Sequence, residues 1–130
     1  ESAVLIGFSY MLSGLTYCIV FYFIVQDMFA NRHDATYSLL AAASAYFLIA
    51  VIFGCLYAMV AVRNPMMLGT GVTTSLELVH RTFKMSHFVV AGFDVPDFAG
   101  EMMQNLAVVE AFISNLFIIF VVGRLMANQN

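Results

Sequence analysis

Acidic and histidine side chains are the residues of this 130-residue sequence best suited to chemistry. Glu77 and His80 have the Glu-x-x-His spacing of a di-iron carboxylate motif, but such a site needs a second copy and two further glutamates on neighbouring helices. His80 and His87 are seven residues apart, which places them on one helix face, where they could bind haem or copper between chains. Hydrogen-bonded structural histidines explain the same pattern. We therefore predict no metal site and no cofactor.

The sequence lacks the motifs of familiar enzyme classes. It contains no glycine-rich phosphate loop, no Ser/His/Asp order and no C-x-x-C pair. Cys18 and Cys55 both lie inside apolar runs, so a disulfide framework is not expected. We predict that the protein is not an enzyme and has no catalytic residues.

Composition indicates a membrane protein. Apolar residues make up 62% of the chain and charged residues 10%, whereas about a quarter of the residues of a soluble domain are charged. Five basic residues against eight acidic ones give a net charge of −3, which argues against binding to nucleic acid through phosphates. We predict an integral membrane protein in contact with the lipid bilayer.

Three apolar runs are long enough to cross a bilayer, which requires about 20 residues in a helix. The runs at residues 2–25 and 35–62 contain no charged residue, and the run at 102–123 is interrupted only by Glu110. The short polar segment 26–34 separates the first two runs. These two are therefore expected to form an antiparallel helix pair.

A helix too short to cross lies between the second and third runs. Pro65 ends the second helix, and residues 76–88 predict a short helix that is followed by a non-helical piece, 89–96. This order is that of a re-entrant pore loop, which is tolerated at membrane depth where it is buried in protein or lines water. An amphipathic helix on the membrane surface explains the pattern equally well.

Small residues recur four apart in the second run, as the pairs Ala50/Gly54 and Gly54/Ala58. Such pairs let helix backbones approach closely. Contact between copies of the chain is one interpretation. We favour the other, packing within one subunit.

Two stretches resemble the pore domain of bacterial two-transmembrane potassium channels. SAYFL at residues 44–48, followed by LY at 56–57, is similar to the outer helix of that family. NLAVVEAFI at 105–113, followed by Leu116 and by VGRL at 122–125, is similar to its inner helix. The resemblance implies an all-α integral membrane fold, with three transmembrane helices and a re-entrant pore-type helix and loop between the second and third.

The resemblance also implies a division of the chain. Residues 1–36 would be an extra N-terminal transmembrane helix with a short loop, and residues 37–130 the pore module. Within the module the family pattern assigns the outer helix (37–62), pore helix (76–88), filter-like loop (89–96) and inner helix (102–126). It implies the bacterial inner membrane. The partners would be three further copies in a homotetramer if the chain is a channel, or other membrane subunits if it is an accessory protein.

The filter-like loop is where the sequence departs from the family. The family pattern is Thr-Val-Gly-Tyr-Gly-Asp, whose carbonyl groups and Thr hydroxyl replace the hydration shell of potassium. The matching residues are Val90, Ala91, Gly92, Phe93 and Asp94. The Thr hydroxyl and the second glycine are both missing. We therefore expect an ion-channel-like fold without potassium-selective conduction. The alternative is a non-conducting structural or accessory subunit of a larger membrane complex.

Charged residues in this region carry two further expectations. An acid in the middle of a span, such as Glu110, costs about 2.5–3.5 kcal/mol on insertion scales and predicts a partner. The resemblance places Glu110 behind the filter, where it would brace the loop through segment 86–91 or Lys84; the alternative is a neutral acid bonded to a nearby carbonyl. Arg81, which is placed to pair with Glu77, and Lys84 bring positive charge to the predicted pore helix.

Overall fold

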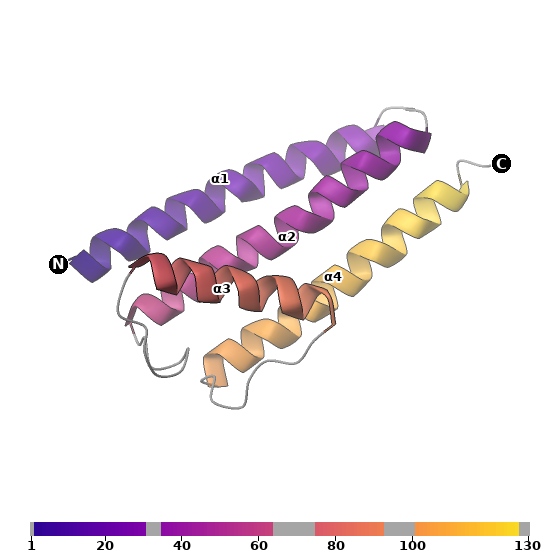
Figure 1. The fold of residues 1–130 in the computed structure, drawn as a ribbon. Coiled ribbons are helices and arrows are strands. Elements are labelled where there is room, and N and C mark those ends of the chain that lie inside the picture. Colours follow the sequence, from indigo (N-terminus) through magenta and orange to yellow (C-terminus); the bar gives the residue numbers. More distant parts are fainter. Residues whose placement is uncertain (1, 31–34, 64–74, 93–100, 128–130) are drawn as a thin grey trace.

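The computed structural model describes residues 2–30, 35–63, 75–92 and 101–127, and this part of the chain is all-α (Figure 1). The helices are α1 (Ser2–Ala30), α2 (Ala35–Arg63), α3 (Ser75–Val90) and α4 (Glu101–Ala127). Three of them contain segments long and apolar enough to cross a membrane, at Val4–Ala30, Thr36–Arg63 and Glu101–Arg124. The prediction of three long apolar helices and one short helix is confirmed, and the three candidate spans indicate an integral membrane protein.

The ends of two helices differ from the prediction. Helix α1 continues to Ala30, beyond the predicted end of the first run at residue 25. Helix α3 includes Val89 and Val90, which the sequence placed in the non-helical piece. The valines are typical of extended backbone, but the helical pattern continues past them: the amide of Ala91 donates to the carbonyl of His87 at 3.0 Å. Gly92, with φ of +97°, then provides the left-handed conformation that ends the helix.

Helices α1 and α2 form the antiparallel pair that the sequence predicts (Figure 1). At the connected end the hydroxyl of Tyr37 donates to a carboxylate oxygen of Asp27 at 2.6 Å. Near the middle of α1, a Cβ placed on Gly14 would lie 3.5 Å from the Cβ of Cys55, so the two backbones come close there. This pair forms one side of the molecule.

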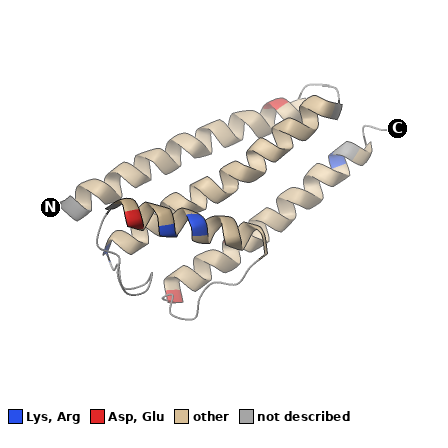
Figure 2. Cartoon of the chain, in the orientation of Figure 1, with Lys and Arg blue, Asp and Glu red and all other residues tan. Residues whose placement is uncertain are grey.

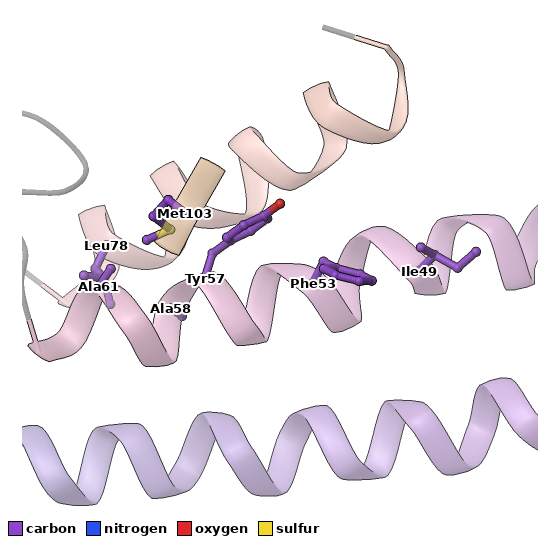
Figure 3. Packing of buried hydrophobic residues seen from close by; sticks show 7 residues of the cluster. All are labelled: Ile49, Phe53, Tyr57, Ala58, Ala61, Leu78 and Met103. Atoms are coloured by element: carbon purple, nitrogen blue, oxygen red, sulfur yellow. The ribbon is translucent and has the colours of Figure 1, made fainter. Parts of the chain in front are cut away.

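The core lies where α2, α3 and α4 meet, with α2 in the centre. Figure 3 shows seven of its buried residues. Five come from α2, one from α3 and one from α4: Ile49, Phe53, Tyr57, Ala58, Ala61, Leu78 and Met103. Because lipid tails are as apolar as these side chains, close packing and hydrogen bonds hold such helices together in a membrane, and not the removal of apolar surface from water.

The small residues of α2 pack within one chain. A Cβ on Gly54 would lie 2.7 Å from Cδ1 of Phe83, so the Phe83 ring of α3 rests directly on the α2 backbone. Ala50 and Ala58, one turn to either side, are also buried. The favoured interpretation of the Ala50/Gly54/Ala58 repeat, packing inside one subunit, is confirmed.

The C-terminal end of α4 lies beside the C-terminal end of α1. Arg124 Nη2 donates to the carbonyl of Phe29 at 2.9 Å, and its guanidinium lies 5.6 Å from the centre of the Phe29 ring. Two turns earlier on α4, the ring of Phe117 packs on that of Phe21 at 5.8 Å. Helix α4 therefore runs from the Arg63 end of α2, where Met103 packs in the core, to the end that carries the α1–α2 connection.

Candidate functional site

Glu110 is fully buried at the junction of three helices. The hydroxyl of Tyr57 from α2 donates to Oε1 at 2.8 Å, and the hydroxyl of Ser86 from α3 lies 2.5 Å from Oε2. Ser86 Oγ is also 2.5 Å from the carbonyl oxygen of Ala50, in α2. We call these four groups the Glu110 cluster. It links α2, α3 and α4 through three side chains and one backbone carbonyl.

The helices present these groups because each has a polar position on its buried face. Figure 3 shows Tyr57 projecting from α2 on the side away from α1. On α3 the buried residues recur every three or four positions, at Leu78, Thr82, Ser86 and Val89. The Thr82 hydroxyl is bonded inside its own helix, to the carbonyl of Leu78 at 2.9 Å. Ser86 is therefore the polar residue of this face whose side chain hydrogen-bonds to other helices.

The number of protons in the cluster is limited. Ser86 carries one hydroxyl proton, yet its oxygen is 2.5 Å from two oxygens, and the Ala50 carbonyl can only accept. Either this proton is shared, or a protonated Glu110 donates to Ser86 while Ser86 donates to Ala50. Both arrangements satisfy every carboxyl oxygen. In either arrangement the cluster joins α2, α3 and α4 by hydrogen bonds.

The filter-like residues are only partly within the described structure. Val90 lies at the end of α3, and its carbonyl oxygen accepts a hydrogen bond from the hydroxyl of Tyr46 at 2.8 Å. Ala91 and Gly92 are exposed in the turn that follows. Phe93 and Asp94 lie outside the described residues. The contact of Glu110 with α3 is at Ser86, four residues before Val90.

Sequence reasoning missed Tyr57 and Tyr46 as site residues, and named them only as part of the family-like pattern. A signal was present, because a hydroxyl inside an apolar span must find a partner among its neighbours. Which neighbour it finds depends on how the helices pack. Ser86 lies in the 86–91 segment in which a partner for Glu110 is expected.

The charged residues of the described chain gather on α3 and near the ends of the long helices, apart from Glu110 (Figure 2). Arg81 Nη2 donates to Oε1 of Glu77 at 2.8 Å, the pairing that the spacing predicts. Lys84 is exposed, and its ammonium lies 5.6 Å from the centre of the Phe88 ring. Positive charge on α3 is thus only partly balanced within the helix.

The histidines of α3 take different positions. Nδ1 of His87 is 2.6 Å from the carbonyl oxygen of Phe83, and its ring meets that of Phe47 edge-on at 4.9 Å. His80 is exposed. In the four described ranges, no group of three or more His, Cys, Asp or Glu residues could hold a metal ion.

In comparisons with known proteins, no family model matches the chain, and no curated protein or solved structure is significantly similar to it.

Proposed function

We propose that the chain is an ion-channel-like pore module of a membrane, with α3 as a re-entrant helix and with no selectivity for potassium. The observation that carries this proposal is the attachment of α3 to the middle of two spans. Ala50 is halfway along the Thr36–Arg63 segment, and Glu110 is in the middle third of the Glu101–Arg124 segment. Ser86 is bonded to both.

The depth of α3 follows from its contacts in order along the helix. Leu78 packs with Ala61 and Met103, near the ends of their spans. Ser86, two turns later, reaches the Ala50 carbonyl, and Val90 then meets Tyr46. A helix lying on the membrane surface would not approach the middle of two spans. These contacts favour a helix that enters the bilayer from the Arg63 end and stops near the midplane.

The end of α3 argues against a potassium filter. The first filter-like residue, Val90, has no hydroxyl, and its carbonyl is already bonded to the hydroxyl of Tyr46 on α2. A filter needs its carbonyl groups aimed at the ion. Gly92 ends a helix in the described structure, which is a different use of a glycine from a filter.

We expect the residues on either side of α3 to lie on one face of the membrane. In vesicles of a variant without native cysteines, Arg63→Cys and Glu101→Cys should react with a membrane-impermeant thiol reagent from the same side. Ala30→Cys and Ala127→Cys serve as matched controls and should react from the opposite side. Reaction of Arg63→Cys and Glu101→Cys from opposite sides would show that α3 crosses, and would overturn the re-entrant placement.

We expect no potassium-selective current. The purified protein would be reconstituted in planar bilayers with a potassium gradient and the reversal potential read, with an established potassium channel as positive control. Silence, or a reversal near zero, agrees with the missing hydroxyl and the bonded Val90 carbonyl. A reversal near the potassium equilibrium potential contradicts the prediction.

A non-conducting accessory subunit is the second candidate. The hydrogen bond that occupies the Val90 carbonyl favours it, because a chain that does not conduct can use its filter-like residues for packing. Oligomeric state in mild detergent separates the two candidates. A homotetramer agrees with the pore, and a single copy bound to other membrane subunits agrees with the accessory protein.

A further inference from the structure

The side of α3 that faces away from the Glu110 cluster carries a row of exposed residues at every fourth position. The opposite side of the helix is buried against α2 and α4. Residues four apart share one helix face. We call this row the outer face of α3, and it consists of Leu76, His80, Lys84 and Phe88.

The outer face lies at hydrocarbon depth if α3 is placed as proposed above. Lys84 precedes Ser86 by two residues, so its backbone is at most about 3 Å farther from the midplane along the helix axis. His80 precedes Ser86 by six residues, at most about 9 Å. The hydrocarbon core extends about 15 Å to either side of the midplane. The four-carbon stem of Lys84 therefore cannot carry its ammonium to the headgroups.

Contact with lipid tails would be energetically unfavourable for this face, because it carries a charged side chain. An ammonium at membrane depth faces a protein interior or a water-filled cavity, and not lipid tails. The described contact of Lys84 is the ring of Phe88, which leaves its charge in place. The neighbouring Arg81 is paired with Glu77, so these two charges largely cancel. What remains along the outer face is a positive charge that needs water.

We propose that the outer face of α3 lines a water-filled vestibule that attracts small inorganic anions of the chloride class. This inference rests on the proposed re-entrant placement of α3. It deepens that proposal by naming the sign of the ion drawn to this part of the pathway. Lys84 supplies the attraction, and His80, one turn away, lies on the same water-exposed wall.

Cysteine reactivity tests both whether water reaches the outer face and whether the charge of Lys84 attracts anions there. In the full chain, with Cys18→Ala and Cys55→Ala to remove the native thiols, His80→Cys would serve as the reporter beside an intact Lys84. Leu15→Cys, exposed in the middle of α1, is the lipid-facing control. Each variant would be treated in vesicles with an anionic and a cationic membrane-impermeant methanethiosulfonate, and both rates normalised to those of a small free thiol.

The expected result is reaction at His80→Cys, with a preference for the anionic reagent, and none at Leu15→Cys. Side chains four apart on a helix are about 5–6 Å from each other. At that distance in water, one positive charge changes the anionic-to-cationic rate ratio by about tenfold. Adding Lys84→Gln, which keeps the length of the side chain and removes its charge, should return the ratio to near one.

Two results would overturn the inference. Lack of reaction at His80→Cys means that lipid or another protein surface covers the outer face. Reaction without a preference for the anionic reagent would mean that Lys84 does not determine the electrostatic potential at this position. A preference that persists in Lys84→Gln would mean the same. The labelling at Arg63→Cys and Glu101→Cys is read separately. If those two react from one side while His80→Cys is silent, the vestibule fails and the re-entrant helix stands; if they react from opposite sides, both fail.

Discussion

Replacing Glu110 by leucine is expected to lower the free energy of unfolding in detergent by about 1–3 kcal/mol, the usual cost of leaving buried polar groups without partners. The hydroxyl of Tyr57 loses its acceptor, and Ser86 loses one of its two contacts. Glu110→Gln should be tolerated, because the amide oxygen can accept from Tyr57 and the amide nitrogen can donate to Ser86. Reversible unfolding in a denaturing detergent, compared among the three proteins, measures the difference.

The matched control is Val108→Leu, which introduces the same side chain at an exposed position of α4. It should leave stability within about 0.5 kcal/mol of the parent, as surface substitutions usually do. Tyr57→Phe removes the hydroxyl that Glu110→Leu strands, so the double variant should lose less than the sum of the two single ones. Equal stability of the Leu and Gln variants would mean that Glu110 does not fasten the helices together.

Adding one methyl group at Gly54 is the second change with a large expected effect. In Gly54→Ala the new Cβ would lie 2.7 Å from Cδ1 and 2.9 Å from Cε1 of Phe83, closer than van der Waals contact allows. Either the ring or the whole of α3 must move away from α2. Overpacking of this kind costs about 1–3 kcal/mol. The same unfolding measurement would detect it.

Two other helical glycines are controls for the Gly54 variant. A Cβ on Gly7 or Gly123 would meet nothing within 4 Å, so Gly→Ala there should be neutral or stabilise by up to about 1 kcal/mol through backbone entropy. Phe83→Leu, combined with Gly54→Ala, should recover part of the loss by shortening the side chain that clashes. If Gly54→Ala behaves like the two controls, the close approach of α2 and α3 is wrong.

The long elements of the fold were predictable, because uninterrupted apolar runs have few alternatives to membrane-spanning helices. The end of α3 was not. Val89 and Val90 favour extended backbone by their side chains, yet α3 continues through them, and the tertiary contact of Val90 with Tyr46 accompanies that extension. Local propensity of this kind is routinely overridden by tertiary packing.

Of the candidate site, the sequence identified the acid, and the family resemblance gave the segment 86–91 that contains one of its partners, Ser86. An acid inside a span must have a partner, which identifies Glu110 from the sequence alone. The identity of the partners is a property of packing: Tyr57 is 53 residues away along the chain and Ser86 is 24. No periodicity in one helix shows which side chains of another will face it. The contact between Tyr57 and Glu110 follows from how α2 and α4 pack, which only the structure shows.

The order of the Glu110 cluster along the chain bears on how the protein is made. Ala50 and Tyr57 belong to the second span, Ser86 to the short helix that follows, and Glu110 to the last span, so synthesis delivers both hydroxyl donors before their shared acceptor. Ser86 already has a carbonyl to bond when α3 first docks. The acid, whose burial in lipid alone would be unfavourable, is the final part to enter. We therefore expect α4, on insertion, to complete a site whose other groups are already in place on the earlier helices.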